Sequence, residues 1–213
     1  MNTKEHFVLT ISREVGSGGH TVGKILADKL GVRYCDKILL ESLEKQFGLS
    51  ASGIEKLKGQ KHNWLKDFLD KVTPMPSAEV LGLDPKFSQE FRINVTSADI
   101  FKAEVEILTG LAQIGSCVTA GRSGFFVFKD HPNHLNVFIT ASTPHRIARI
   151  MKKQNLPEES AKALIDGIDQ ARENYIRRFT GSSRYDLRNY DLVLCADGHT
   201  EEELANLILN YIG

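Results

Sequence analysis

Short apolar segments alternate with longer amphipathic segments along most of the chain. Five segments are almost continuously apolar, as strands buried on both faces of a sheet are: His6–Ser12, Val32–Cys35, Cys117–Gly121, Asn136–Ala141 and Tyr190–Ala196. Five others carry apolar residues at helical spacing: His20–Gly31, Ser97–Gly115 with Ser97 as the expected cap, Thr143–Asn155, Pro157–Phe179 and Thr200–Ile212. This alternation predicts an α/β fold, with a parallel sheet covered by helices on both faces.

One region interrupts the alternation. The segment 37–96 is largely polar and holds the only tryptophan, Trp64, and its part from Val72 to Phe91 is rich in turn residues. We expect a helical insertion with a loose connection there, between the second and third strands. The whole chain, 1–213, is then one domain.

Composition limits the classes of partner. The 213 residues are 41% hydrophobic and 25% charged, which suits one ordinary globular core. Lys+Arg and Asp+Glu both number 27, so no global field favours nucleic acid or an anionic membrane, and an anion site must be local. The start lacks the apolar run of a signal peptide, and no segment approaches the length of a membrane span. We therefore expect a cytoplasmic protein.

Cysteine and histidine do not indicate a metal site. Cys35, Cys117 and Cys195 lie far apart within or beside apolar runs, and we expect small buried residues. His131 and His134, in HPNH, form the only close histidine pair, and a surface turn explains it better than a ligand pair.

A glycine-rich stretch follows the first strand and leads into a helix. Backbone N–H groups at such a helix start, helped by the helix dipole, form a phosphate site. The literal G-x-x-x-x-G-K match at Gly18–Lys24 is accidental, because Ile25 follows it and Lys24 falls inside the helix. A turn that only joins strand to helix is the alternative, but the glycines exceed what a turn needs.

In a second register, Ser12–Gly31 resembles the phosphate loop of the cytidylate kinases, with matches at Gly16, Gly18, Thr21, Lys24, Leu26, Ala27, Leu30 and Gly31. Arg13 replaces the first glycine, and Gly19 replaces the lysine that reaches the β- and γ-phosphates. The resemblance implies that ATP is held by Arg13, Gly16, Ser17, Gly18, Gly19, His20 and Thr21, and that Thr21 lies nearest to Mg²⁺. The missing cation would come from Arg13, Lys24 or Lys37, of which Lys37 is the most open.

The segment Cys117–Ser142 resembles the same family more specifically, at Gly121, Arg122, Gly124, Val127, Phe128, Leu135, Phe138, Ala141 and Ser142. The resemblance assigns Arg122 to the phosphate of the acceptor. Ser123 stands where the family has an aspartate facing the pyrimidine, which leaves base selectivity open. Alternatively, Arg122 pairs with a carboxylate and has only a structural role.

A third match, Ile165–Phe179, resembles the family's lid, and we place the lid region at 156–189. Asp166, Asp169 and Arg172 match, whereas Ile165 replaces an arginine. The resemblance implies that Asp169 and Arg172 hold the acceptor. Another arginine of this region would act on the developing charge of the transferring phosphoryl group: Arg177, Arg178, Arg184 or Arg188. A solvated charged helix is the alternative.

Together, these matches imply a three-layer P-loop kinase fold whose five-stranded parallel sheet has the order 2-3-1-4-5. The insertion 37–96 would take the place of the acceptor-binding region. The expected reaction moves the γ-phosphoryl group of ATP–Mg²⁺ to a nucleoside monophosphate, CMP first, with Arg122, Arg172, Arg177, Arg178 and Lys37 as catalytic residues. A nucleotide-binding protein without phosphotransfer, or a kinase of another small acceptor, stays open. No oligomeric state is predicted.

Overall fold

One parallel sheet organises the protein. The computed structural model describes residues 1–58 and 95–213. Its five strands are ordered β2-β3-β1-β4-β5, which confirms the predicted sheet: β1 Val8–Arg13, β2 Arg33–Tyr34, β3 Cys117–Ala120, β4 His134–Thr140 and β5 Leu192–Cys195. Every pair of neighbouring strands is parallel, and β1 lies between β3 and β4.

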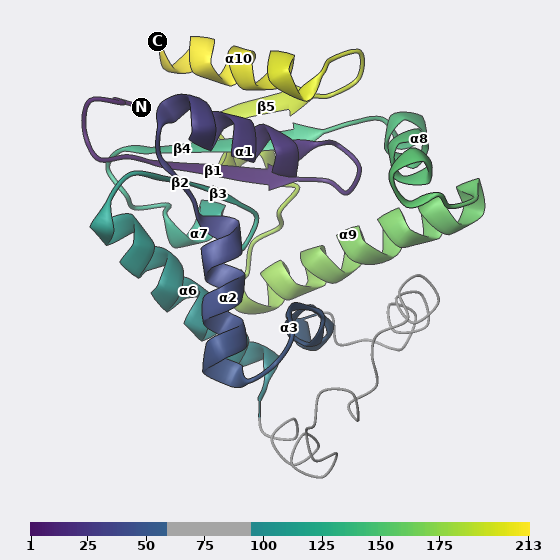
Figure 1. Cartoon of the computed structure of the whole chain (residues 1–213), viewed down its shortest axis with the longest axis horizontal. Coiled ribbons are helices and arrows are strands. Elements are labelled where there is room, and N and C mark those ends of the chain that lie inside the picture. The colour runs from purple at the N-terminus through teal and green to yellow at the C-terminus, as the bar shows by residue number, and fades with distance from the viewer. Residues whose placement is uncertain (59–94) are drawn as a thin grey trace.

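Helices cover both faces of the sheet (Figure 1). On one face lie α1 and α10, which span Gly19–Leu30 and Glu201–Ile212. The other side is covered by α2 Cys35–Phe47, α6 Ser97–Ile114 and α7 Gly124–Val127. Three helices lie beyond the sheet: α3 Ala51–Lys58, α8 Thr143–Gln154 and α9 Glu158–Thr180.

The hydrophobic core has one cluster on each face of the sheet. Leu9 and Ile11 of β1 pack with Leu26 of α1 and Ile208 of α10, and all four are fully buried. On the opposite face, Val8, one position out of phase with Leu9, packs with residues of α2, α3 and α6. A third cluster joins α8 to α9. This alternation of sides is what the period of two along a strand requires.

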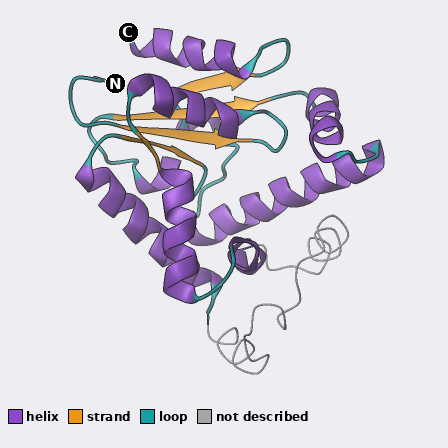
Figure 2. Ribbon diagram, in the orientation of Figure 1, coloured by secondary structure: helices purple, strands orange, loops and turns teal. Residues whose placement is uncertain are grey.

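The carboxyl ends of the strands point to the same side of the molecule, where α8 stands (Figure 2). Ligands of open α/β sheets bind at this edge, because the loops that follow the strands meet there. Helix α8 begins directly after β4, with Ser142 as its cap and Pro144 in its first turn. The loop between β1 and α1 opens at this same edge.

Two strand predictions need correction. Cys35 is the first residue of α2, so β2 keeps only Arg33 and Tyr34 of the expected strand. Cys195 is exposed, contrary to our expectation of a buried residue, because β5 is an edge strand whose outer positions face solvent. Cys35 and Cys117 are buried, as predicted.

The cap of α6 also differs from the prediction. Thr96, not Ser97, is the N-cap: its hydroxyl accepts a hydrogen bond from the Asp99 N–H, at 3.2 Å. The Asp99 carboxylate accepts from the Thr96 N–H in return, at 2.9 Å. This reciprocal capping box uses two backbone donors that a helix start leaves free, which a Ser97 cap would not.

The described part of segment 37–96 is helical up to Lys58, in α2 and α3. Trp64 and the turn-rich part 72–91 lie outside the described residues. The region 156–189 holds α9 and the short 3-10 helix Leu187–Asn189. Their roles as acceptor-binding region and lid stay predictions.

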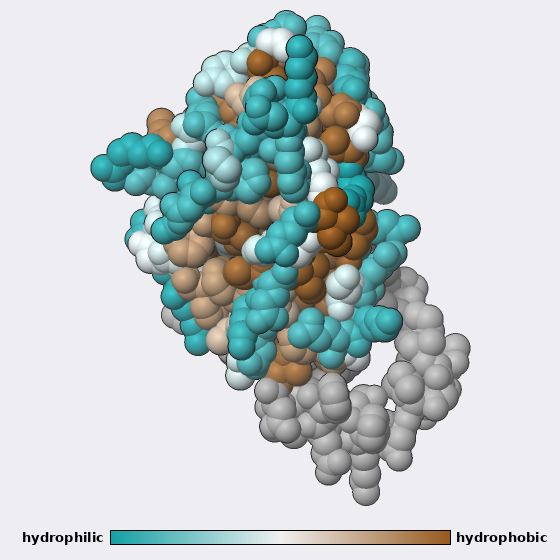
Figure 3. Space-filling view, turned by 90° about the vertical axis from the view of Figure 1, so that its left-hand side faces the viewer, coloured by the Kyte–Doolittle hydropathy of each residue, from teal (hydrophilic) through white to brown (hydrophobic). Residues whose placement is uncertain are grey.

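The surface mixes polar and hydrophobic side chains, as the face in Figure 3 shows. Large exposed hydrophobic side chains come from several elements, with two of them on α10: Ile114, Tyr185, Leu187, Val193, Leu207 and Tyr211. Such scattered exposure is ordinary. His131 and His134 flank a tight turn, as predicted. No described helix is long and apolar enough to cross a membrane.

Candidate active site

The loop between β1 and α1 is built for close backbone approach. Gly16 and Gly18 have φ of 87° and 83°, which side chains other than glycine rarely adopt. A Cβ at Gly16 would lie 2.8 Å from the carbonyl oxygen of Arg146 on α8. We call residues 14–18 the glycine loop. Its shape leaves room for no side chain at Gly16.

The start of α1 presents free backbone donors. The N–H groups of Thr21 and Val22 donate to the Gly18 carbonyl, at 2.9 and 3.2 Å. Within residues 1–58 and 95–213, no acceptor is bonded to the N–H groups of Gly18, Gly19 or His20. Such a row of donors at a helix start attracts an anion, and the helix dipole adds to this effect.

Ser17 fixes the glycine loop from within. Its N–H and its hydroxyl both donate to the Glu14 carbonyl, at 3.3 and 3.0 Å, and the residue is buried. Next to it, a Cβ at Gly18 would lie 3.1 Å from the Cγ of Glu201, which forms an ion pair with Arg149. The glycine loop is therefore held by hydrogen bonds of its own and is packed between α8 and the start of α10.

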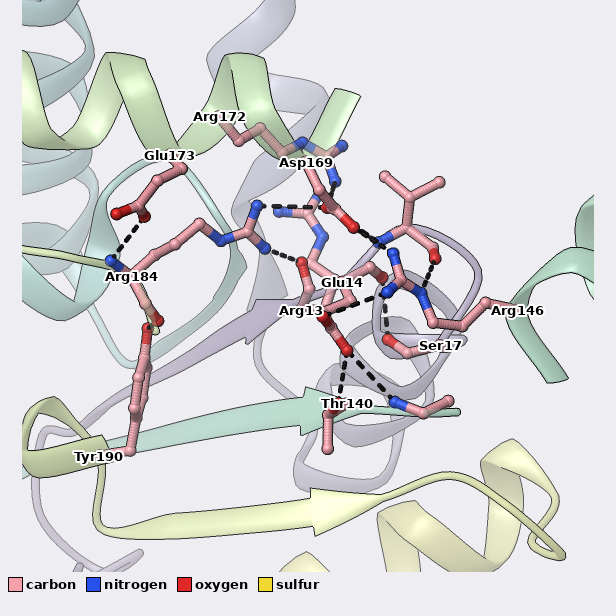
Figure 4. A network of polar contacts seen from close by, with 12 residues as sticks. Arg13, Glu14, Ser17, Thr140, Arg146, Asp169, Arg172, Glu173, Arg184 and Tyr190 are labelled. Atoms are coloured by element: carbon pink, nitrogen blue, oxygen red, sulfur yellow. Dashed lines mark hydrogen bonds and ion pairs between the residues drawn. The ribbon is translucent and has the colours of Figure 1, made fainter. Parts of the chain in front are cut away.

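Asp169 on α9 ties the predicted lid to the glycine loop (Figure 4). Its carboxylate accepts from the Val15 N–H at 3.2 Å and forms ion pairs with Arg146 and Arg184. Arg146 also donates to the Val15 carbonyl, at 2.8 Å, and to Glu14, at 3.2 Å. These buried groups satisfy one another, which a buried ion pair requires.

Arginines outnumber carboxylates around the glycine loop. We define the arginine cluster as Arg13, Arg146, Arg172 and Arg184. Arg146 pairs with Glu14 and Asp169, and Arg172 and Arg184 pair with Asp169. The four guanidinium groups therefore outnumber the two carboxylates that pair with them, and the nearby Glu173 is bonded to Arg177 and to the Arg184 N–H. Burial, then the guanidinium groups of Arg13 and Arg184, lowers the pKa of Arg172. The cluster is short of negative charge and suits an anionic ligand.

A pocket of about 320 Å³ opens beside Asp169. Side chains from α8, α9 and the segment after α9 line it: Arg146, Asp166, Asp169, Gln170, Glu173 and Tyr185. Three of these six residues are carboxylates, so the positive excess of the arginine cluster does not extend into this pocket. We assign no ligand to it.

A second charged group surrounds Arg122, directly after β3. Arg122 and Ser123 both have the left-handed conformation, with φ of 57° and 54°. The Arg122 guanidinium is bonded to three carboxylates, which we call the acidic cluster: Asp36 at 3.3 Å, Glu104 at 3.3 Å, and Glu55. The alternative that we left open, pairing of Arg122 with carboxylates, is therefore observed. Non-glycine residues in this conformation often mark functional sites.

The acidic cluster is held by further cations and donors. Lys58 lies 2.6 Å from Glu104, and the Tyr175 hydroxyl donates to the same carboxylate at 3.0 Å. Burial alone would raise the pKa of Glu55, but Lys58 and Arg122 lower it to about 2. Burial would lower the pKa of Arg122, but Glu55 and Glu104 raise it. Both groups are thus charged at neutral pH.

Asp36 and His20 connect the two charged groups. The His20 ring lies 3.5 Å from Asp36 and 3.0 Å from the Tyr34 hydroxyl. Burial, opposed by Asp36, lowers the pKa of His20. His20 lies in the first turn of α1, whereas Asp36 lies just after β2, in the first turn of α2. The carboxyl ends of β1, β2 and β3 therefore meet around Arg122 and the glycine loop.

Several predicted cations point to solvent. The Lys37 side chain is 84% exposed and lies 3.6 Å from Glu41. Arg177 pairs with Glu173, Arg178 lies over the Phe179 ring, and Arg188 pairs with Asp186. Arg172 and Arg184, by contrast, join the arginine cluster. The structure thus brings two of the predicted lid arginines to the loop, and the catalytic roles of all five stay predictions.

Sequence reasoning identified Asp169 but missed the other carboxylates of the two groups. Glu14 pairs with Arg146, and Asp36, Glu55 and Glu104 pair with Arg122, yet none of the four matched a position of the family's motifs. A signal was available for Asp36, which directly follows a predicted strand, as Arg122 does. Glu55 and Glu104 offered no such signal, because each lies on a helix whose position depends on the fold.

Magnesium would have to bind together with the nucleotide. Among the described residues, no group of three His, Cys, Asp or Glu side chains is arranged to hold a metal ion. The Thr21 hydroxyl, in the first turn of α1, has no described hydrogen-bond partner. The donor set therefore fits a metal held by phosphate oxygens and water, with one protein hydroxyl in addition.

Known proteins resemble this chain in sequence and in fold. A cytidylate kinase from Sulfurisphaera tokodaii is 28% identical over 211 residues, 96% of this chain and 94% of that protein. An uncharacterized protein from Eubacterium ventriosum has a TM-score of 0.64 at 19% identity, over 97% of this chain and 98% of that one. A shikimate kinase from Bacteroides thetaiotaomicron has a TM-score of 0.54 at 15% identity, with the same coverage.

The two structural likenesses concern the fold alone. The likeness to shikimate kinase, together with the order of the five parallel strands, supports the predicted P-loop kinase fold. The sequence profile of the cytidylate kinase-like family matches residues 8–197. This range runs from the first strand to just beyond the last and includes the glycine loop, Arg122 and Asp169. The chain therefore belongs to the cytidylate kinase-like family.

Proposed function

We propose that this protein is a nucleotide kinase that transfers the γ-phosphoryl group of ATP to a nucleoside monophosphate, with CMP as the expected acceptor. The observation that carries the proposal is the row of free N–H groups at Gly18, Gly19 and His20 beside an excess of arginines. Phosphoryl transfer depends on positioning and on charge stabilisation, and these groups supply both.

The ATP phosphates would lie on the glycine loop and the first turn of α1. Arg172 and Arg184 reach the loop from the lid region and would neutralise the charge that spreads over the transferring group. Mg²⁺ supplies further neutralisation when it is bound with the nucleotide, and Thr21 is the residue that we assign to it. Closure of the lid region would exclude water from the reaction.

The acceptor would bind between Arg122 and the lid region. Arg122 would take its phosphate, and Asp169 and Arg172 would contact its sugar and phosphate, as the family resemblance implies. Arg122 is already bonded to the acidic cluster, so an acceptor phosphate has to displace a carboxylate. Glu55, with a side chain 42% exposed, is the partner that we expect to give way, because Glu104 is almost fully buried.

The test is a kinase assay on the purified full chain. ATP, Mg²⁺ and a panel of nucleoside monophosphates are incubated with the protein, and diphosphate products are separated by chromatography. We expect CDP from CMP as the main product. If no monophosphate yields a diphosphate above a protein-free blank, the enzymatic proposal fails.

Two features favour other functions strongly enough to test. Gly19 replaces the usual lysine, which favours a nucleotide sensor without phosphoryl transfer. Calorimetry would then show ATP binding alongside zero turnover.

The Ser123 hydroxyl is buried without a described partner, at the position of the family's base-reading aspartate, which favours another small acceptor. A screen of small metabolites for ATP consumption tests that second alternative.

A further inference from the structure

The Arg13 side chain crosses the start of α1. Arg13 is the last residue of β1, and a Cβ placed on Gly19 would lie only 2.6 Å from its Cβ and 3.1 Å from its Cγ. Its guanidinium ends over Gly121, where a Cβ would overlap the Nη1 atom. The Arg13 side chain therefore packs directly on the backbone of Gly19 and Gly121, where a larger residue would leave it no space.

Two hydrogen bonds hold this path in place. Arg184 donates to the backbone carbonyl of Arg13, and the Gly121 N–H donates to the Ile11 carbonyl at 2.8 Å. Gly121 also has φ of 73°, which disfavours any other residue. The backbone at both ends of the side chain is therefore fixed before any ligand binds.

Arg13 differs from Arg122, Arg146 and Arg184, because no carboxylate of the described residues forms an ion pair with it. Arg122 and Arg146 each pair with two or more carboxylates, and Arg184 pairs with Asp169. Within residues 1–58 and 95–213, no hydrogen bond or ion pair engages the Arg13 guanidinium. An arginine whose stem passes Gly19, at the start of α1, and whose guanidinium pairs with no described carboxylate is suited to an anion.

We propose that Arg13 is a phosphate-contacting catalytic residue that supplies, from the end of β1, the cation that Gly19 lacks. The two positions form an exchanged pair: a side chain at Arg13 requires glycine at 19, because a Cβ there has no space. This inference rests on the proposed function, since the anion that Arg13 would contact is the β- or γ-phosphate of the nucleotide.

The other two cations named from the sequence are less suited. Lys24 is exposed on α1, beyond the first turn that carries the free N–H groups. Lys37 is 84% exposed and lies beside Glu41. Burial, then the charges of Arg122 and Arg184, lowers the pKa of Arg13, whereas Asp36 raises it. An anion bound beside Arg13 would offset its repulsion from Arg122 and Arg184. A solvent-exposed lysine experiences no such repulsion and gains less from an anion.

The experiment exchanges the two residues. Full-length R13G, G19K and R13G/G19K are compared with the unmodified protein, and K102A serves as the matched control, because Lys102 is exposed on α6 and pairs only with Glu106. In R13G we expect kcat to fall by about 100-fold or more, the usual cost of one such cation. In R13G/G19K we expect recovery to within about 10-fold of the unmodified protein.

A second measurement does not depend on activity. In apo protein, G19A lowers Tm by about 3–8 °C because its Cβ meets Arg13, whereas the same substitution in an R13G background changes Tm little. Calorimetry with ATP–Mg²⁺ and with inorganic tripolyphosphate should show affinity lost by about 10-fold or more in R13G and kept in K102A.

Distinct results overturn the two proposals. If the unmodified protein binds tripolyphosphate and ATP but transfers nothing, only the proposed function fails, and the affinity of R13G still tests Arg13. The inference about Arg13 is wrong if folded R13G keeps full affinity and kcat, or if R13G/G19K recovers neither. It is equally wrong if the unmodified protein binds neither polyphosphate.

Discussion

The Asp169 carboxylate accepts a hydrogen bond from the Val15 N–H, at 3.2 and 3.3 Å to its two oxygens, although 154 positions separate the residues. This contact, together with the ion pairs of Asp169, fixes helix α9 to the glycine loop. A residue that the sequence assigned to the acceptor thus also organises the phosphate side of the site.

We expect D169N to destabilise the fold. The substitution removes the charge that Arg146 and Arg184 face while keeping an oxygen for the Val15 N–H, so buried arginines lose their counter-charge. The free energy of unfolding should fall by about 3 kcal/mol in urea titrations. D166N is the matched control, because Asp166 is exposed one turn away on α9. Equal stability of the two variants would contradict this account.

Arg184 and Arg188 should behave very differently, although both follow α9. Arg184 is buried and bonded to Asp169, whereas the Arg188 side chain is 89% exposed and pairs only with Asp186. We expect R184A to lose about 2–4 kcal/mol of stability, and kinase activity with it. R188A should stay within about 0.5 kcal/mol of the unmodified protein. Urea unfolding and turnover, measured on the same samples, test both; similar losses in the two variants would show that burial does not separate them.

The fold and the arginines were predictable, but their partners were not. The alternation of strands and helices follows from local patterns, whereas the order of the strands and the site positions of Arg122 and Asp169 came from the family resemblance. The carboxylates of the acidic cluster come from three helices, α2, α3 and α6, whose relative positions are set by packing in the fold. The course of the Arg13 side chain depends on the absence of a Cβ at Gly19. This contact joins the end of β1 to the start of α1, and the spacing of residues along the sequence does not predict it.

Arg122 should control the acceptor rather than ATP. R122K keeps the charge in the acidic cluster but loses the planar, two-pronged donor that suits a phosphate. We expect KM for the accepting monophosphate to rise by about 10-fold, with KM for ATP unchanged, in steady-state kinetics. R33K is the control, because Arg33 is an exposed arginine on β2. An equal rise in both KM values would place Arg122 outside the acceptor site.

The stability of the fold should depend on His134 in acid. The Thr10 hydroxyl donates to Asn136, so Nε2 of His134, 2.8 Å away, is the donor to Thr10. Burial, reinforced by His131 and opposed by Asp191, lowers the pKa of His134 to about 4. In the unfolded chain the ordinary value is about 6.5. Between these two values the unfolded chain binds the extra proton.

Stability should therefore be complete above pH 6.5 and fall as the pH drops toward 4, with His134 contributing a loss of about 2 kcal/mol by pH 5. In H134Q the side-chain amide still donates to Thr10 but does not titrate, so its stability should decline less over pH 6.5–5. Urea unfolding of both proteins at matched pH values gives the difference. Because other titrating groups are common to both, parallel stability curves would show that His134 is not the source of the acid sensitivity.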